Sequence, residues 1–108
     1  MPVMTAEPAL APLAQACEAI ATARRLALSY AGHDRVVEVH VAGYTRQGEP
    51  LMRAWQVRGG SESGEPVGWK TFDLLRVTSL RLSPERSRAP RDGYQRIDPA
   101  IHRIVCQV

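Results

Sequence analysis

The chain of 108 residues contains only two cysteines, Cys17 and Cys106, and no Cys-x-x-Cys or closely spaced Cys/His pair. A zinc site or a redox pair is therefore not predicted, and we expect both cysteines to be reduced thiols in the core. Histidine is also scarce, with three residues far apart in the sequence. Because a metal site needs three or four converging ligands, we expect no metal and no cofactor.

A long uninterrupted apolar run is absent as well. The alanine-rich N-terminal stretch has no basic start, is interrupted by Pro2, Pro8 and Pro12, and carries its arginines at its end. This pattern is typical neither of a signal peptide nor of a membrane span. We therefore expect a cytoplasmic protein that does not associate with a membrane.

Lysine occurs once, at position 70, so that thirteen of the fourteen cations are arginine. Arginine favours flat, bidentate contacts to carboxylate or phosphate over attraction between point charges. The formal net charge is +3, and the excess is concentrated after residue 80, where six arginines stand against three carboxylates. This basic segment either serves solubility or contacts a polyanion.

Residues 59–70, GGSESGEPVGWK, have the glycines of a phosphate-binding loop but not its lysine. Glu65 follows Gly64, where that lysine would stand, and Lys70 comes later, at the start of a predicted strand. A phosphate loop requires a helix to begin there, because the helix N-terminus stabilises the phosphate. We therefore predict a mobile hairpin connection over residues 59–68 that binds no phosphate.

No spacing typical of a catalytic serine, cysteine or carboxylate pair is present, so the chain is predicted not to be an enzyme. His40 lies on a predicted strand where its orientation could be fixed. It is either a general base or, as we expect, a strand residue with hydrogen-bonded ring nitrogens.

A helix is predicted over residues 12–25, because apolar residues repeat there at intervals of three and four: Leu13, Cys17, Ile20 and Ala21. Pro12 suits the first turn, and the arginines at positions 24 and 25 would complement the dipole of the last turn. Residues 1–11 are predicted to be a flexible N-terminus.

After the helix the apolar period changes to two, which predicts short strands between residues 26 and 82. Gly32 and Asp34 are turn formers, so the first two strands should form a hairpin. The third strand, LMRAWQV, is apolar on both faces, which predicts that both faces are covered. The residues predicted to form the core are Leu26, Leu28, Val37, Val39, Val41, Ala54, Phe72 and Val77.

Residues 83–100 contain three prolines and show no periodic pattern. A segment of this length is either flexible or laid along the rest of the domain, and we expect the second, with Tyr94 as its anchor. Residues 101–108 then read as a last strand, so that 83–108 form a C-terminal extension.

The order of these elements resembles the WYL domain family over about residues 13–82. The positions that fit the family pattern are Ala19, Ile20, Tyr30, Arg35, Gly43, Ala54, Phe72 and Arg76. The Trp-Tyr-Leu triad that names the family is replaced by Pro50, Leu51 and Met52, and Val39 stands in place of a usual proline. The resemblance implies a mainly β fold, an N-terminal helix followed by a small Sm-like, Src-homology-3-like β-barrel, and hence one domain over residues 12–108.

Members of this family are mostly regulatory parts of bacterial transcription factors and are thought to bind nucleotides or nucleic acid. The family's three basic positions read here as Lys70, Asp73 and Arg76. The resemblance thus implies a ligand-sensing domain that binds single-stranded nucleic acid or a nucleotide-type ligand through a basic face. We expect Trp55 or Trp69 to add stacking on bases. The candidate binding residues are Arg53, Lys70, Arg76, Trp55, Trp69 and His40.

Two alternatives stay open. The three cations among the candidates could be separate solvated charges, or Lys70 and Arg76 could simply neutralise Asp73. Alternatively, the chain is a protein–protein interaction or assembly module that has lost ligand sensing. In that case its C-terminal strand would pair between copies to give a homo-oligomer.

Overall fold

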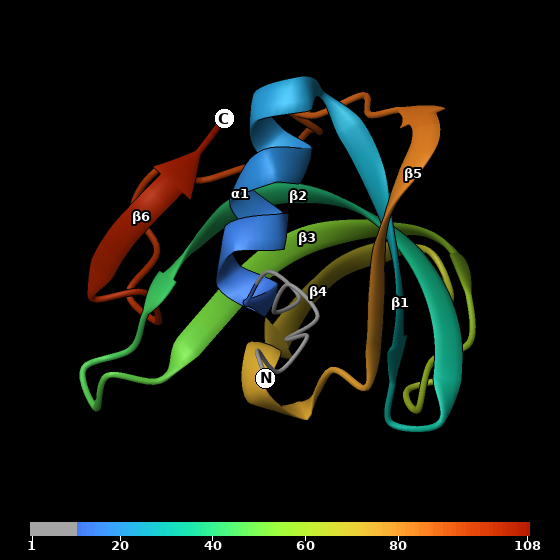
Figure 1. The fold of residues 1–108 in the computed structure, drawn as a ribbon, viewed down its shortest axis with the longest axis horizontal. Coiled ribbons are helices and arrows are strands. Elements are labelled where there is room, and N and C mark those ends of the chain that lie inside the picture. The colour runs from blue at the N-terminus through green and yellow to red at the C-terminus, as the bar shows by residue number, and fades with distance from the viewer. Residues whose placement is uncertain (1–10) are drawn as a thin grey trace, which may run out of the picture.

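The computed structural model describes residues 11–108, so the flexible N-terminus expected over residues 1–11 lies, apart from its last residue, outside the described range. The described chain is mainly β, as predicted, with one α-helix (Figure 1). Its elements are α1 (Pro12–Thr22), β1 (Arg24–Tyr30), β2 (His33–Tyr44), β3 (Pro50–Gly59), β4 (Gly68–Asp73), the short 3-10 helix η1 (Leu74–Arg76), β5 (Ser79–Arg86) and β6 (Arg103–Gln107).

Helix α1 ends at Thr22, three residues earlier than predicted. Ala23 adopts the left-handed conformation, with φ 53° and ψ 44°, and its N–H bonds to the carbonyl oxygen of Ile20 at 3.2 Å. A left-handed residue commonly terminates a helix, but the usual residue is glycine, so the alanine gave no signal. The two arginines expected in the last helical turn therefore belong to β1.

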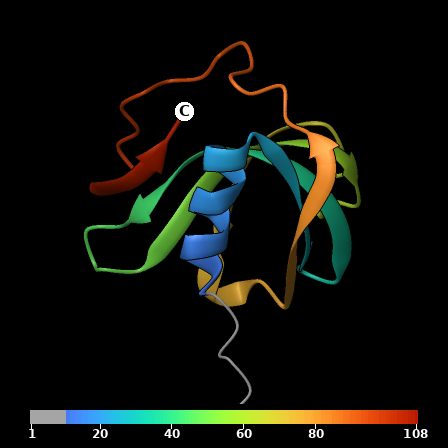
Figure 2. The same cartoon turned by 45° about the horizontal axis from the view of Figure 1, so that its top comes forward.

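The six strands form one antiparallel sheet in the order β4-β3-β2-β1-β5, and β6 pairs with the C-terminal half of β2. The predicted hairpin of β1 and β2 is confirmed, although Ala31 and Gly32 alone form its turn, both with positive φ. The sheet curves around α1, which lies across its concave side (Figures 1 and 2). Within residues 11–108 the sheet is open, because its edge strands β4 and β5 do not pair with each other.

The core lies between α1 and the concave face of the sheet. Six of the eight predicted core residues are buried there: Leu26, Leu28, Val37, Val39, Ala54 and Phe72. Val77 is half-buried and packs against this cluster. Val41 is buried too, but on the outer face, which is turned away from α1, because a β-bulge between Val39 and Val41 shifts the alternation of side chains.

Cys17 on α1 and Cys106 on β6 form a disulfide, with their Cα atoms 5.6 Å apart. The expectation of two reduced thiols is therefore wrong. Strand β6 pairs with the end of β2, and α1 packs against both strands, which brings together two cysteines 89 positions apart in the sequence. Their separation along the chain does not indicate that the two cysteines are close in space.

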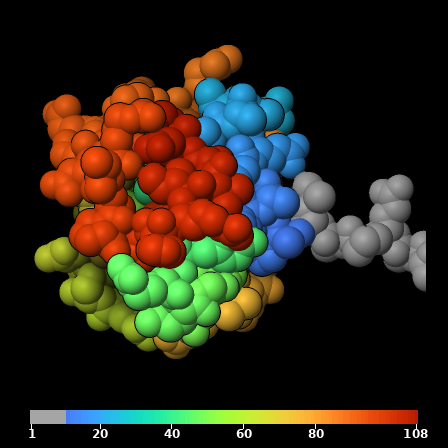
Figure 3. Space-filling model, turned by 90° about the vertical axis from the view of Figure 1, so that its left-hand side faces the viewer, coloured from blue at the N-terminus to red at the C-terminus, as the bar shows by residue number. Residues whose placement is uncertain are grey.

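Residues 87–102, which we call the tail, join β5 to β6 and run over the outer face of the sheet (Figures 2 and 3). The backbone N–H of Arg88 donates to the carboxylate of Glu38 at 2.8 Å, and the ring of Tyr94 lies 5.2 Å from that of His40. The prediction of a segment laid along the domain, with Tyr94 as an anchor, is confirmed for residues 87–100, whereas residues 83–86 of the predicted segment belong to β5. The tail thus covers the second face of the sheet, as the pattern of the third strand predicted.

Candidate functional site

Five of the six candidate residues are divided between the two faces of the sheet, and the sixth, Arg76, lies in η1, so they do not form the single basic face that we predicted. Directly paired residues of antiparallel strands share a face. Arg53 pairs with Thr71, whereas Lys70 pairs with Ala54, which is buried in the core. Arg53 therefore lies on the outer face and Lys70 on the core side. Grouping them was wrong because successive residues of a strand point to opposite faces.

His40, Trp55 and Trp69 lie on the outer face and form, with Tyr94 of the tail, an aromatic cluster. The rings of Trp55 and Trp69 meet edge to face, with centroids 5.5 Å apart, and the His40 ring lies 4.6 Å from that of Trp69. The rings of Trp69 and Tyr94 are 26° from parallel. Much of this aromatic surface is therefore used in packing the tail onto β3 and β4.

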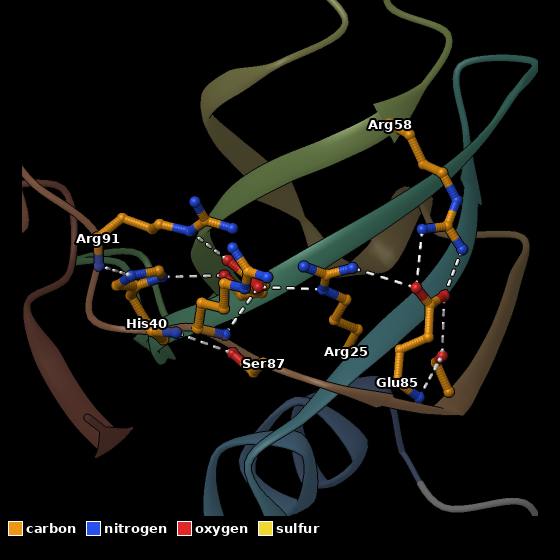
Figure 4. A network of polar contacts seen from close by, with 10 residues as sticks. Arg25, His40, Arg58, Glu85, Ser87 and Arg91 are labelled. Atoms are coloured by element: carbon orange, nitrogen blue, oxygen red, sulfur yellow. Dashed lines mark hydrogen bonds and ion pairs between the residues drawn. The ribbon is translucent and has the colours of Figure 1, made fainter.

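His40 is fully buried, and both of its ring nitrogens are hydrogen-bonded (Figure 4). Nε2 accepts the backbone N–H of Arg91 at 2.9 Å, so Nδ1 carries the proton and donates it to the carbonyl oxygen of Glu38, also at 2.9 Å. Burial lowers the pKa of His40 and thus favours this neutral form. The expectation of a hydrogen-bonded strand residue is confirmed.

Glu38, beside His40, is a fully buried carboxylate surrounded by donors. Oε2 accepts from Nε of Arg25 at 3.0 Å and from the backbone N–H of Arg88 at 2.8 Å, and Oε1 accepts from Nε of Arg91 at 2.6 Å. Burial raises the pKa of Glu38, but the hydrogen bonds from Arg91, Arg88 and Arg25 together outweigh it and bring the pKa below its usual value. The carboxylate is therefore ionised and joins β1, β2 and the tail.

Arg25 extends this network to Glu85 on β5, whose carboxylate it contacts at 3.1 Å (Figure 4). Arg58 donates to both oxygens of Glu85 and, with Arg25, lowers the pKa of that carboxyl to about 2. Among residues 11–108, four arginines are thus paired with carboxylates: Arg25, Arg53, Arg58 and Arg91.

Three other cations lie on the core side of the sheet or at its edge and form what we call the basic cluster: Arg35, Lys70 and Arg76. None of them forms an ion pair with any residue of the described chain 11–108. In particular, Asp73 does not neutralise Lys70 or Arg76, and its Oδ1 accepts the backbone N–H of Leu75 at 3.0 Å. The alternative in which these cations serve only to neutralise Asp73 has no contact to support it.

Arg35 is the member of the basic cluster that was not among the six candidate binding residues, although it fits the family pattern. It is only 6% exposed, and its guanidinium carbon lies 5.4 Å from the ring centre of Tyr30 and 5.6 Å from that of Phe72. Its terminal nitrogens donate to Gln56 and to the carbonyl oxygen of Tyr30, whereas its buried Nε has no hydrogen-bond partner among residues 11–108. The guanidinium carbon of Arg76 is 5.9 Å from the Tyr30 ring centre. The sequence signal that could have identified Arg35 is its position two residues before Val37, in the same alternation as the core residues Val37 and Val39.

Lys70 lies two residues before Phe72, on the same face of β4. Its Nζ donates to the hydroxyl oxygens of Ser61 and Ser63, both at 3.1 Å, in the connection between β3 and β4. That connection joins a strand to a strand, as predicted, and no helix follows its last glycine. Its mobility and its lack of phosphate binding stay predictions.

Comparison with known proteins gives no match: no family model matches the chain, and neither a curated protein nor a solved structure does so. Over residues 11–108 no three His, Cys, Asp or Glu side chains gather in a way that could hold a metal ion. No helix in that range is long and apolar enough to cross a membrane.

Proposed function

We propose that the chain is a non-enzymatic ligand-sensing domain that binds an anionic ligand, a nucleotide or single-stranded nucleic acid, at the basic cluster. The observation that carries this proposal is the buried charge of Arg35, which has no carboxylate partner in the described chain. A buried cation without a counter-ion costs free energy, and a bound anion would offset that cost. Lys70 and Arg76 are also free of carboxylates and would extend the positive potential toward solvent.

The aromatic surroundings of the cluster support the same ligand class. Tyr30 lies within 6 Å of two guanidinium groups, those of Arg35 and Arg76. A half-buried ring beside cations suits a nucleotide, because the cations contact phosphate while a ring contacts the sugar or base. The outer-face candidates, His40 and the two tryptophans, are not part of this proposal.

The Sm-like, Src-homology-3-like barrel and membership of the WYL family belong to the same proposal. A helix followed by a curved antiparallel sheet supports them, and Arg35, Lys70 and Arg76 all stand at positions of the family pattern. A role in bacterial transcription regulation rests on the resemblance alone. The disulfide does not favour the proposed cytoplasmic location, because disulfides are rare in the cytosol.

The proposal is tested with a fluorescently labelled oligothymidylate, whose binding is followed by anisotropy as the salt concentration rises. Changing Lys70 and Arg76 together to alanine should weaken binding and reduce the salt slope by about 1.4, or about 0.7 for each lost phosphate contact. The matched control changes two exposed arginines that form no ion pair in the described chain, Arg86 and Arg88, to alanine. Equal losses in both variants would indicate diffuse charge, and no binding at low salt would reject the proposal.

A second candidate function, the assembly module, is favoured by β6. This strand pairs only with β2 in the described chain, and Ile104 and Val105 on it are 37% and 50% exposed. An edge strand with apolar side chains can pair with a second copy. Sedimentation would then give an oligomer that persists on dilution and that Val105→Lys disrupts, with no affinity for oligothymidylate.

A further inference from the structure

A cavity of about 320 Å³ lies between the tail and the outer face of β3 and β4, and we call it the tail pocket. The sheet contributes Arg53 and Trp69 to its lining, and the tail contributes Tyr94, Asp98 and Pro99. It lies on the opposite side of the sheet from the Lys70 side chain, so it is separate from the basic cluster. Its volume is at the lower end of the range of small-molecule sites.

A buried ion pair fixes one end of the tail pocket. Asp98 is 7% exposed, and its Oδ2 accepts from Nε of Arg53 at 2.5 Å while its Oδ1 accepts the backbone N–H of Ala100 at 2.9 Å. Burial raises the pKa of Asp98, but the hydrogen bonds from Arg53 and Ala100 outweigh it and hold the pKa below its usual value. The carboxylate is therefore ionised and holds the guanidinium group in one orientation.

The outer half of the Arg53 guanidinium remains available. Only Nε is used in the ion pair, and Nη1 and Nη2 donate to no group of residues 11–108. The side chain of Arg53 is 33% exposed, and it lines the cavity. Two parallel N–H donors fit two adjacent acceptors on a ligand. Because Asp98 already balances the charge of Arg53, this end of the pocket suits a neutral ligand better than a phosphate.

The other side of the pocket is an aromatic wall. The rings of Trp69 and Tyr94 are 26° from parallel with centroids 6.4 Å apart, and Trp69 Nε1 donates to the carbonyl oxygen of Asp92 at 3.2 Å. The tail approaches this ring so closely that a Cβ on Gly93 would lie 3.0 Å from Nε1 of Trp69. His40 packs against the same ring on the sheet side. The wall is thus held in place by contacts from both layers.

We propose that the tail pocket binds a single guanine-type base. The base would lie against the aromatic wall of Trp69 and Tyr94, and its two adjacent acceptors, O6 and N7, would receive the free N–H groups of Arg53. Bidentate contact between arginine and these two atoms is the commonest specific contact of arginine with a base. Adenine and uracil present no pair of adjacent acceptors, whereas cytosine presents O2 and N3 on a smaller ring that would cover less of the aromatic wall. Recognition of this kind needs no phosphate and is independent of the basic cluster.

The test uses the full chain and three uncharged nucleosides, guanosine, adenosine and uridine, in titrations followed by NMR chemical shifts; of the three, only guanosine presents two adjacent acceptors on its base. Guanosine should bind at least about tenfold more tightly than the other two. Arg53→Lys retains the positive charge beside Asp98 but lacks the two Nη groups that would contact O6 and N7, so it should remove the preference for guanosine. Tyr94→Leu should weaken the binding of all three nucleosides, because each stacks on the aromatic wall.

The controls separate this site from the basic cluster. Arg81→Lys makes the same substitution at an exposed arginine outside the pocket and should leave guanosine affinity unchanged. The Lys70→Ala, Arg76→Ala variant should also bind guanosine normally, whatever becomes of its affinity for oligothymidylate. The inference is overturned if guanosine shows no saturable binding, if the three nucleosides bind equally, or if Arg53→Lys keeps the preference. Loss of guanosine binding in the Lys70, Arg76 variant would also overturn it.

Discussion

The backbone N–H of Arg91 donates a hydrogen bond to Nε2 of His40, at 2.9 Å, so the tail docks on the sheet through an unprotonated ring nitrogen. A protonated ring would place a second N–H against that of Arg91 and lose the bond. Besides the Arg91 guanidinium, the groups around the imidazole are the Glu38 carboxylate and the rings of Trp69 and Tyr94. The docking of the tail should therefore depend on pH.

We predict that the free energy of unfolding decreases as the pH falls below about 6.5. Burial lowers the pKa of His40, so in this range the unfolded chain binds the proton more readily than the folded one. The contribution is complete above the ordinary histidine pKa of 6.5 and is lost as the pH falls toward the depressed value. Urea unfolding at pH 7.5 and pH 5.5 measures it. His40→Gln, which can still accept the N–H, should reduce the difference, whereas the exposed His102→Gln should not. An equal difference in all three proteins would contradict this.

A second prediction concerns the buried carboxylate of Glu38. Glu38→Gln leaves Arg91 without its counter-ion and Arg25 with Glu85 alone, and breaking a buried ion pair typically costs about 3–5 kcal/mol. The same change at Glu85, which is 37% exposed, should have a much smaller effect, because solvent screens that pair. Chemical unfolding of both variants measures the contrast. Similar losses in the two would show that Glu38 is not the centre of the network.

Sequence alternation located most of the core because burial of apolar side chains decides that part of the fold. Val37 and Val39 are buried where the period of two placed them. The alternation failed at Val41, because the bulge around His40 turns the Val41 side chain to the outer face. No residue type marks a bulge of this kind in the sequence. The candidate binding residues are divided between the two faces because side chains alternate along each strand. Arg53 and Lys70 are close along paired strands, yet their side chains lie on opposite faces.

Contacts between segments far apart in the sequence could not be predicted from local sequence patterns. The ion pairs of Glu38 come from β1 and from a tail that has no periodic pattern. The disulfide depends on where β6 pairs, which the sequence left open. Arg35 could have been included among the candidate binding residues, because it occupies a core-facing register, but its lack of a carboxylate partner is visible only in three dimensions.

The disulfide gives a third prediction. Reducing the bond between Cys17 and Cys106 releases a closed loop of about ninety residues in the unfolded chain, and such bonds typically stabilise a fold by about 2–4 kcal/mol. Urea unfolding with and without a phosphine reductant measures the loss, and amide exchange should accelerate in β6, Arg103–Gln107. The Cys17→Ala, Cys106→Ala variant is the control and should not respond to the reductant. Two free thiols by mass spectrometry in the untreated protein would refute the pairing.

The last prediction asks whether Arg35 serves the fold or a ligand. Arg35→Met replaces a buried cation that has no counter-ion with an apolar side chain of similar length, which removes a desolvation cost along with the bonds to Gln56 and Tyr30. Gln56 keeps its bond to the carbonyl oxygen of Gly60. We therefore expect a free energy of unfolding within about 1 kcal/mol of the wild type, but weaker binding of oligothymidylate.

The matched control is Arg25→Met, the same substitution at a cation that contacts two carboxylates, Glu38 and Glu85. It should destabilise the fold strongly, because a buried carboxylate loses one of its donors, and should leave the basic cluster intact. Urea unfolding and anisotropy titrations on both variants give the comparison. If Arg35→Met proved as destabilising as Arg25→Met, Arg35 would be a structural residue. Its uncompensated charge would then no longer support an anion site, and the assembly module would become the better account of this domain.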